Sequence, residues 1–336
     1  MTRQSLVDII IVNFNGGEFI SECIEAVRNQ TFREFHVYVI DNNSTDGSVD
    51  LLAVEDERFT IVRNTENLGF AAACNQGAAL GNAPWIAMLN PDTAPKTDWL
   101  EEAVRCGEKH KAEMVGCTML SKRNPAKLDG VGDAYSPLGL AWRGGYDWPA
   151  DQAPDHDGRI FGPCAAAALY RRDIYMDSGG FDEQFFCYVE DVDLAFRLRL
   201  YGAECVHASD AVVYHFGSGI SGRRSEFTIF HGTRNRVWTW VKNAPPLMFV
   251  LTMPFVAMVN LVFLLRSAFH GKFRCTARAL GEAIRGLGPI LESRRDIQKK
   301  RTANSLTISK AMTWSPVKLL TRAPDIRRIA QPPNGA

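Results

Sequence analysis

The stretch Val7-Asp8-Ile9-Ile10-Ile11-Val12 is a short apolar run rich in β-branched residues, which predicts a buried strand. Similar runs occur at His36–Ile40, Thr60–Val62 and Trp85–Leu89. Helical patterns lie between these runs, among them the alanine-rich stretch Phe70–Leu80. Strands that alternate with helices predict an α/β fold with a doubly wound, mostly parallel sheet flanked by helices.

Polar residues follow three of these predicted strands. They are Asn13 and Asn15 after the first, Asp41 to Asp46 after the second, and Asn90 and Asp92 after the fourth. Such residues commonly form turns and helix caps. However, ligands of doubly wound sheets bind beyond the carboxyl ends of the strands. We therefore expect a binding site there, with Asp41 placed to accept hydrogen bonds from a base or a ribose.

The loop after the first strand excludes two common kinds of nucleotide site. Asn13-Phe14-Asn15-Gly16-Gly17 lacks the Gly-x-Gly-x-x-Gly pattern that lets a pyrophosphate approach a helix N-terminus. The chain also has no Gly-Lys-Ser/Thr of the P-loop type. A nucleotide diphosphate bound here would have to be neutralised by a metal ion and by side chains.

A second stretch predicts a helix with an acidic first turn. Apolar residues recur at spacings of three and four, and a glycine that can end the helix follows them: Val189, Val192, Phe196, Leu200 and Gly202. The acids are Glu190, Asp191 and Asp193. Acids here commonly complement the helix dipole, yet the apolar, glycine-led approach before them suits a carboxylate in a cleft. Asp191 is therefore a candidate general base, which the dipole is expected to keep ionised.

Five motifs now occur in the order seen in family 2 glycosyltransferases. They are Ile10–Asn15, Val39–Ser48, Asn67–Phe70, Leu89–Asp92 and Glu190–Leu194. The chain most resembles the rhamnosyltransferase-type branch of that family, which has the GT-A fold, over about Val7 to Ser221. The resemblance implies an inverting, metal-dependent transferase in cell-surface polysaccharide synthesis. The implied donor is a nucleotide sugar, with dTDP-L-rhamnose as the best choice, and the acceptor is a glycan that is lipid-linked.

The resemblance also implies roles for single residues. Nucleotide-sugar contacts are expected from Val12, Asn13, Asp41, Asn67, Gly69, Asn75 and Asn90. The family's metal-binding Asp-x-Asp is here Asn90-Pro91-Asp92, so only Asp92 keeps a carboxylate. His215, at the end of a predicted strand, matches the family's further metal ligand. The implied metal is Mg²⁺ or Mn²⁺.

Acceptor recognition is assigned to the region between the fourth strand and the acidic helix. Residues 128–158 are rich in Gly, Pro, Asp and aromatics, and Trp142 among them can stack on a sugar or anchor a loop. Gly162 opens a stretch of small residues that allows backbone to approach substrate, although its alanines suit core packing equally well. Glu190, beside the candidate base, is assigned to the acceptor as well.

A single displacement with one base gives inversion, with Asp191 taking the acceptor proton. A hydrolase would need a second carboxylate across the bond, and nothing in the sequence pairs Asp191 in that way. The alternatives are a catalytically silent nucleotide-sugar or carbohydrate-binding protein of the same fold, and a transferase that uses another donor sugar.

Charge divides the chain unevenly. Residues 1–265 hold 23 Lys and Arg against 34 Asp and Glu, whereas residues 266–336 hold 15 against 4. A basic C-terminal region predicts an anionic partner. An amphipathic pattern over Phe269–Arg301 favours a membrane surface, and no nucleic-acid-binding module is recognisable.

Residues 244–265 carry no charge and are long enough to span a bilayer. Three prolines and Asn260 argue against a simple spanning helix, and a buried helical hairpin is the alternative.

These patterns predict two regions. Residues 1–235 form the glycosyltransferase domain, with a nucleotide-sugar half over 1–125 and an acceptor half over 126–235, and residues 236–336 form a helical, membrane-associated extension. Eight scattered cysteines, without a zinc-like spacing, are expected to be reduced. With no apolar signal segment before the first strand, we expect a cytoplasmic protein at the inner face of the plasma membrane. The oligomeric state stays open.

Overall fold

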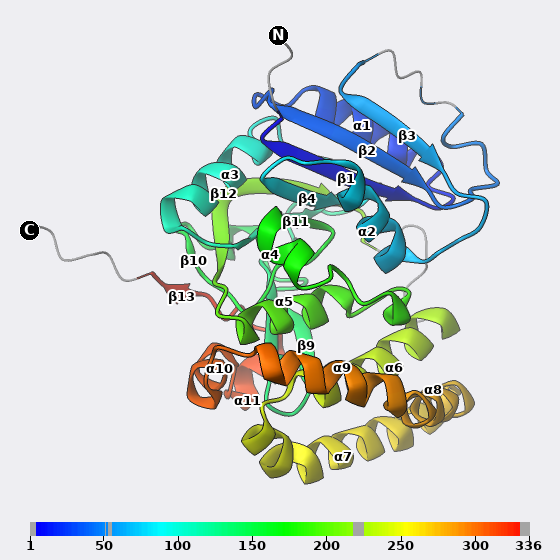
Figure 1. Cartoon of the computed structure of the whole chain (residues 1–336), viewed down its shortest axis with the longest axis vertical. Helices are drawn as coiled ribbons and strands as arrows, with labels where there is room; N and C mark the ends of the chain where they lie inside the picture. Colours follow the sequence, from blue (N-terminus) through cyan, green and yellow to red (C-terminus); the bar gives the residue numbers. More distant parts are fainter. Residues whose placement is uncertain (1–4, 51, 53–55, 218–224, 330–336) are drawn as a thin grey trace, which may run out of the picture.

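The computed structural model describes residues 5–50, 52, 56–217 and 225–329 (Figure 1). Residues 218–221 of the family-like region therefore lie outside the described part. The strands are β1 (Val7–Asn13), β2 (Phe35–Asp41), β3 (Phe59–Arg63), β4 (Trp85–Leu89), β5 (Thr93–Pro95), β6 (Met114–Ser121), β7 (Leu128–Gly130), β8 (Asp133–Ser136), β9 (Leu140–Arg143), β10 (Gly158–Arg159), β11 (Ala167–Arg171), β12 (Cys205–His215) and β13 (Arg327–Arg328).

The helices complete the fold. They are α1 (Phe19–Arg28), α2 (Phe70–Leu80), α3 (Trp99–His110), α4 (Arg172–Asp177), α5 (Glu190–Leu200), α6 (Glu226–Asn243), α7 (Pro246–Phe269), α8 (Phe273–Arg285), α9 (Leu287–Lys300), α10 (Ser305–Ala311) and α11 (Pro316–Thr321), with short 3₁₀ turns η1 (Ala150–Gln152) and η2 (Glu183–Phe185).

The central sheet has the strand order β13-β10-β12-β6-β11-β4-β1-β2-β3. Strand β1 pairs in parallel with β2 and β4, and β2 pairs in parallel with β3. Strand β11 runs antiparallel between β4 and β6, while β6 and β12 are parallel. The predicted α/β sheet flanked by helices is confirmed, with β11 and β10 as reversed strands in this order. The register sets Asn13 opposite Asp41, so the polar strand ends meet at one edge.

The burial of strand β1 explains the continuous apolar run in its sequence. Every residue from Val7 to Asn13 is buried, because successive side chains of a strand face opposite sides of the sheet. Ile9 and Ile11 pack in the core that holds α1, and Ile10 and Val12 pack in the core that holds α2. A strand covered on both faces has no polar side.

The C-terminal region departs from its predicted boundary. Residue 235 lies inside α6, which continues to Asn243, so the division at 235/236 cuts a single helix. Strand β13, near the end of the chain, also pairs with β10 of the main sheet. Helices α6 to α9 lie together below the sheet (Figure 1). The C-terminal helices therefore pack on the α/β body and do not form a separate unit joined to it by a linker.

The structure decides between the alternatives for the uncharged stretch. Residues 246–269 form one helix, α7, instead of a hairpin, because Pro246 occupies a first-turn position that tolerates proline and Pro254 is accommodated inside. The basic stretch after it is two helices, and part of its apolar face packs on α6, while Ile284 and Leu291 stay exposed. Ala279, Ala283 and Ile290 are fully buried there.

Helices α5 and α6 are joined through a buried carboxylate. Asp193 has no exposed surface and accepts hydrogen bonds from Arg197 Nε (2.9 Å), Lys242 Nζ (2.8 Å) and Asn243 Nδ2 (2.7 Å). Burial alone would raise the pKa of Asp193, but Lys242 and Arg197 hold it below its ordinary value. Asp193 is therefore a structural acid.

We expect Lys242→Ala to lower the free energy of unfolding by about 3–5 kcal/mol, because it leaves Asp193 buried without its main partner. Urea unfolding measures the loss. The matched control is Lys299→Ala, whose ion pair with Asp296 spans 3.9 Å on the surface, and which should change stability by about 0.5 kcal/mol or less. Equal losses in the two variants would contradict a special role for the buried pair.

Candidate active site

The floor of the site is a pair of buried polar residues at adjoining strand ends. Asn13 Nδ2 donates to Asp41 Oδ1 (3.1 Å) and to the hydroxyls of Ser44 and Ser48 (3.0 Å each). The Ser44 amide donates to Asp41 Oδ2 at 3.3 Å. Asn13 is fully buried and Asp41 is 4% exposed. These bonds fix the direction of the Asp41 carboxylate, and Val12 lies on the neighbouring strand, opposite Ile40.

Asn42, to which the sequence assigned no role, shapes the neighbouring loop. Its Nδ2 donates to Asn67 Oδ1 (2.9 Å) and to the Gly69 carbonyl (3.2 Å), and its Oδ1 accepts from Asn64 Nδ2 (3.1 Å). This network places Asn67 and Gly69 beside the Asp41 cluster. Gly69 has φ +85°, and a Cβ there would lie 2.5 Å from the Phe186 ring. The glycine is thus required by packing against the segment that leads to α5.

The Asn75 side chain makes its hydrogen bonds outside this cluster. Its Nδ2 donates to the Phe181 carbonyl (2.8 Å), and its Oδ1 accepts from Tyr175 Oη (2.7 Å) and from the Phe181 amide (2.9 Å). The side chain is occupied in fastening α2 to the segment before η2.

Asp92 and His215 meet at the other end of the site. Strand β12 pairs with β5 so that His215 lies opposite Thr93, the residue after Asp92. His215 Nε2 is 3.3 Å from Asp92 Oδ1, and its Nδ1 is 2.6 Å from Asp129 Oδ2. Burial opposes a charge on His215, but these two carboxylates outweigh it and raise its pKa.

The pair fits a divalent cation. A carboxylate oxygen and an imidazole nitrogen that face each other at this distance are common ligands of such ions. Asp129 on the opposite ring nitrogen sets the tautomer that leaves Nε2 free to bind a metal, as the partners of ligating histidines do. The donor set therefore agrees with the metal-ligand roles expected for Asp92 and His215.

Two residues of this site were missed from the sequence. Asp129 orients His215, and the Arg143 guanidinium hydrogen-bonds Asp129 and lies 3.2 Å from Cys164 Sγ. Both fall in the segment assigned broadly to the acceptor. No local pattern marked them, because their partners are 86 and 14 residues away in sequence.

A cavity of about 350 Å³ lies beside these groups. Its lining includes four of the predicted residues, Asn90, Trp142, Glu190 and Asp191, together with Asp133, Arg143, Tyr188, Thr228 and Gly232. Asn90 Oδ1 is buried and has no hydrogen-bond partner among the described residues. A buried amide oxygen without a partner is a free acceptor for a ligand donor.

Asp191 is the carboxylate best suited to be ionised in this cavity. Burial raises the pKa of Asp191, but amide hydrogen bonds from Ala165 (3.1 Å) and Val192 (2.8 Å) and the charge of Arg143 limit the rise. Burial and the nearby Asp191 charge raise the pKa of Glu190 well above its usual range. Acids whose pKa values are pushed apart take different roles.

Asp133 shares this environment, since burial and Asp191 raise its pKa as well. Asp133, Cys164 and Asp191 place one potential ligand atom each within 4.8 Å of one another. Mg²⁺ and Mn²⁺ prefer oxygen ligands to a thiol, and the Arg143 cation already neutralises this group. Asp92 and His215 are the better cation site.

The entry to α5 is strained and clamped by α6. Phe186, Tyr188 and Val189 all have positive φ, at +64°, +69° and +69°, and for a β-branched residue this is a true outlier. Asn235, fully buried on α6, donates to the carbonyls of residues 185, 187 and 188 at 2.9, 3.0 and 2.8 Å. Such strain persists only where the surroundings hold it. Asn235 therefore helps to aim the first turn of α5.

Trp142 and Gly162 are the other two residues assigned to the acceptor, and their surroundings differ. Trp142 lines the cavity, but its Nε1 donates to the Ala323 carbonyl (3.1 Å), so it also anchors the C-terminal segment. At Gly162 a Cβ would lie 2.5 Å from that of Ala195 on α5. This helix thus approaches the backbone at Gly162 closely, and the assignment of that glycine to the acceptor stays a prediction.

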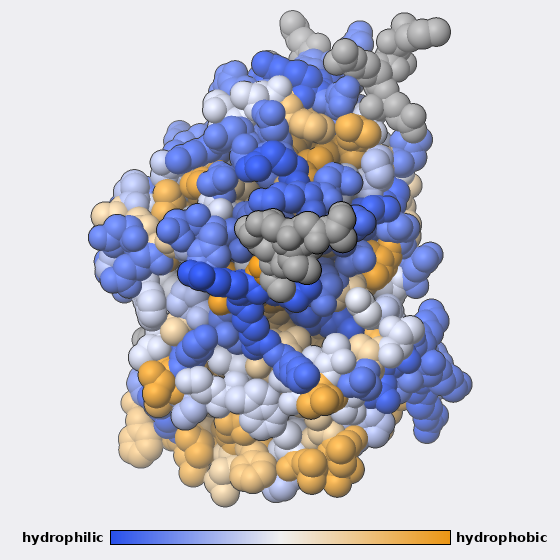
Figure 2. Space-filling model, turned by 90° about the vertical axis from the view of Figure 1, so that its left-hand side faces the viewer, coloured by the Kyte–Doolittle hydropathy of each residue, from blue (hydrophilic) through white to orange (hydrophobic). Residues whose placement is uncertain are grey.

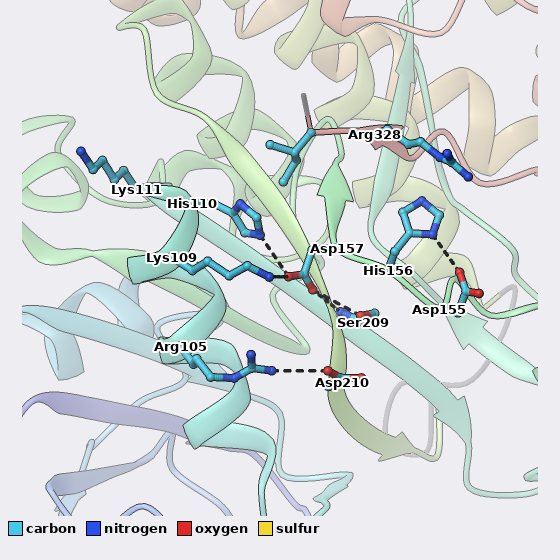
Figure 3. A pocket seen from close by; sticks show the side chains of 11 residues that line it. Arg105, Lys109, His110, Lys111, Asp155, His156, Asp157, Ser209, Asp210 and Arg328 are labelled. Atoms are coloured by element: carbon cyan, nitrogen blue, oxygen red, sulfur yellow. Dashed lines mark hydrogen bonds and ion pairs between the residues drawn. The ribbon is translucent and has the colours of Figure 1, made fainter. Parts of the chain in front are cut away.

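A second cavity, about 870 Å³, is larger and lies elsewhere (Figure 3). Asp157 at its centre already accepts from His110 (3.0 Å), Lys109 (3.2 Å) and Ser209 (3.2 Å). Cys106 lies within ligand distance of His110 and Asp157, but burial raises the pKa of this thiol to about 12, so it keeps its proton. None of the predicted site residues lines this cavity, and the charges of Arg105, Lys109 and Asp157 are paired.

Comparisons with known proteins identify the family and the fold. The model of the family described as Glycosyl transferase family 2 matches residues 8–179. A region of 113 residues, 33% of this chain, is 31% identical to an uncharacterized glycosyltransferase of Haemophilus influenzae and covers 35% of that protein. The match to glycosyltransferase GlyG of Streptococcus pneumoniae covers 38% of that protein. The chain thus matches little more than a third of these two relatives.

A longer match is to the N-acetylglucosaminyl-diphospho-decaprenol L-rhamnosyltransferase of Mycobacterium tuberculosis. The two are 26% identical over 245 residues, which cover 65% of this chain and 78% of that protein.

Among solved structures, the mannosyltransferase PcManGT of Pyrobaculum calidifontis in complex with GDP-Man and Mn²⁺ aligns with a TM-score of 0.54 at 18% identity. The alignment covers 95% of this chain and 88% of that one. TarS 1-349 of S. aureus in complex with UDP-GlcNAc aligns with a TM-score of 0.55 at 14% identity, covering 91% and 90%. These likenesses show the fold, which is of the GT-A type.

The second partner of His215 gives a direct test of the cation site. We expect Asp129→Asn to weaken Mn²⁺ binding by about 10- to 100-fold, because losing the carboxylate on Nδ1 removes the group that orients the ring. Manganese titration followed by electron paramagnetic resonance measures this. Asp155→Asn, at an acid that is 97% exposed in the other cavity, should leave the affinity unchanged. An unaltered affinity in Asp129→Asn would contradict the His215 assignment.

Proposed function

The chain belongs to glycosyl transferase family 2, and on that basis we propose that it transfers a sugar from a nucleotide diphosphate donor to a hydroxyl of a glycan acceptor, with inversion. The observation that carries the proposal is the position of Asp191. It lies in a cavity beside an arginine and beyond the strand ends that hold Asp41 and the Asp92–His215 pair. We place the nucleoside contacts, the cation site and the base in one site, because Asn90 lines this cavity and Arg143, which also lines it, hydrogen-bonds Asp129, the partner of His215.

The proposed reaction is a single displacement. Asp191 accepts the proton of the acceptor hydroxyl as its oxygen forms a bond to the anomeric carbon. The bond from that carbon to the diphosphate oxygen breaks, and its electron pair leaves with the diphosphate. Burial and the Asp191 charge raise the pKa values of Glu190 and Asp133 well above the usual range, which favours Asp191 among the three as the ionised acid.

The rest of the site binds and orients. Asp41 and Asn13 contact the nucleoside, with Asn67 and Gly69 beside it, and Asn90 offers its unpartnered oxygen to the sugar. Asp92 and His215 would hold Mg²⁺ or Mn²⁺, which when bound neutralises charge on the diphosphate leaving group. Trp142 and Glu190 line the acceptor side of the cavity.

For the donor we propose dTDP-L-rhamnose. Its support is the resemblance of the five motifs to the rhamnosyltransferase-type branch and the 26% identity to a relative named an L-rhamnosyltransferase. The name of that relative also contains a diphospho-decaprenol, which supports a lipid-linked acceptor in cell-surface polysaccharide synthesis. With such an acceptor, the protein works at the cytoplasmic face of the membrane, attached through its C-terminal helices.

The alternatives are another donor sugar and a silent binding protein. A binding protein has no need of a carboxylate that the Ala165 and Val192 amides hold in the cavity by hydrogen bonds, and this arrangement favours the enzyme.

Melting temperatures with a panel of nucleotide diphosphates test the donor. A ligand that binds only the folded chain raises the melting temperature according to its concentration over its affinity. We expect dTDP with Mn²⁺ to give a larger shift than UDP or GDP, and the shift to shrink without metal. A larger shift with another nucleotide would mean that the enzyme uses a different donor. No shift with any of them would contradict nucleotide binding, both by the enzyme and by the nucleotide-sugar-binding alternative.

The pH dependence of turnover tests the base. Asp191 acts when ionised, so activity is present above its folded-state pKa and is lost as the pH falls through it. Because burial raises that pKa, the acidic limb of kcat/KM should lie above the pH typical of an ordinary aspartate. Asp191→Asn should lower kcat by about 100-fold or more, while Asp98→Asn, on the surface at the start of α3, should not. Wild-type turnover in Asp191→Asn would refute the assignment.

A further inference from the structure

Helix α7 turns its polar side chains towards the protein. One face repeats every four residues and consists of Met248, Thr252, Val256 and Asn260. Thr252 Oγ1 accepts from Trp240 Nε1 (3.2 Å), and Asn260 Oδ1 accepts from Arg236 Nη2 (2.6 Å). The polar groups that a water-facing helix would expose are thus used to attach α7 to α6.

The opposite face of α7 is apolar and uncovered. Its side chains are between 45% and 64% exposed: Leu247, Val250, Leu251, Phe255, Met258, Leu261, Val262 and Leu265. Only 17% of the most apolar 18-residue window of this helix is buried. The helix forms the lower edge of the molecule in Figure 1, and hydrophobic residues gather along the lower edge in Figure 2. An apolar surface of this extent marks a contact with a partner or a membrane.

The charges around this surface select the partner. Residues 244–281 contain no Asp or Glu, but four basic residues, Arg266, Lys272, Arg274 and Arg278. The rest of the chain before them is acidic. Basic residues next to an inserted apolar face are attracted to anionic lipid headgroups. Charge and hydrophobicity therefore both favour an anionic bilayer over a second acidic protein surface.

The attachment to α6 excludes a spanning orientation for the docked helix. Phe249, near its start, stacks on Trp240 with ring centroids 4.6 Å apart, and Phe263, two thirds of the way along, lies 4.5 Å below the Arg236 guanidinium. A helix that crosses a bilayer would carry this face, with the Arg236 charge against it, through the hydrocarbon, where a charge is costly. Docked along its length, α7 can only lie in the plane of one leaflet.

We propose that α7 is a monotopic membrane anchor, whose outward apolar face enters one leaflet of an anionic bilayer parallel to the membrane plane. The helix on which it docks, α6, also supplies Thr228 and Gly232 to the wall of the cavity. One rigid helix thus joins the bilayer to the site of transfer, which suits an acceptor carried by a lipid. The biological meaning rests on the lipid-linked acceptor proposed above, but membrane binding itself does not depend on it.

Co-sedimentation of the full chain with vesicles tests the proposal. We expect binding to vesicles of phosphatidylcholine with phosphatidylglycerol and weaker binding to phosphatidylcholine alone, with the difference reduced by salt. The double variant Leu251→Glu/Phe255→Glu should lose affinity for the anionic vesicles by about 100-fold, because it removes two buried apolar groups from the bilayer. Equal binding by wild type and this variant would overturn the proposal.

The matched control is Leu80→Glu, at a leucine that is 49% exposed at the end of α2, away from α7. It should bind vesicles as the wild type does. Thermal stabilisation by a nucleotide diphosphate, measured on all variants without lipid, reports that each is folded. That readout also separates the two proposals, because an intact nucleotide shift with no vesicle binding refutes the anchor alone.

Labelling from the outside of the vesicles tests the orientation. Cysteines placed at the two ends of α7, Pro246→Cys and His270→Cys, should both react with a membrane-impermeant maleimide. Reaction at only one end would show a spanning helix. A wild-type dimer that Leu251→Glu/Phe255→Glu converts to a monomer, with no vesicle binding by either, would show that a second copy covers this face.

Discussion

The structure depends on one buried charge, the carboxylate of Asp193. It lies without exposed surface at the interface of α5 and α6 and is neutralised by Lys242 and Arg197. An unpaired carboxylate at this depth would cost several kcal/mol, so the two helices are stable only in the arrangement that keeps the pair together. Asn235 lies on α6 about two turns before Lys242, and the same arrangement lets it hold the strained segment in front of α5. The position of Asp191 follows from these two contacts.

The acidic turn that stood out in the sequence therefore contains three acids with three different tasks. Asp193 joins the helices, Glu190 is buried with a raised pKa, and Asp191 faces the cavity with amide hydrogen bonds that favour its ionised form. Sequence alone treats them alike, since they share one turn and one dipole. What separates them is the arrival of partners from far along the chain, such as Lys242 and the Ala165 amide.

The sequence predicted those helices and strands that a local sequence pattern defines. Helix Phe70–Leu80 and strand Trp85–Leu89 have the predicted bounds, because a periodic apolar pattern between turn residues defines each of them. It also predicted that the strand ends would meet, since parallel strands share one edge.

Asp129 and Asn235 were not predicted, because their roles exist only through contacts across the fold. At Asn75 and Gly162, where ligand contacts are predicted, the structure shows contacts with other elements of the protein. The sequence left two alternatives open for α7, because its prolines were weighed without knowing that one begins the helix.

Helices α5 and α6 connect the proposed cation site, the base and the membrane-facing helix. The central claim is the position of the nucleotide-sugar donor. The most direct measurement is anomalous scattering from crystals grown with Mn²⁺ and dTDP. The account predicts a manganese peak between Asp92 and His215 Nε2, with the nucleoside against Asp41. Manganese on Asp133, Cys164 and Asp191, or on Cys106, His110 and Asp157, or a nucleotide bound in the large charged cavity, would contradict it.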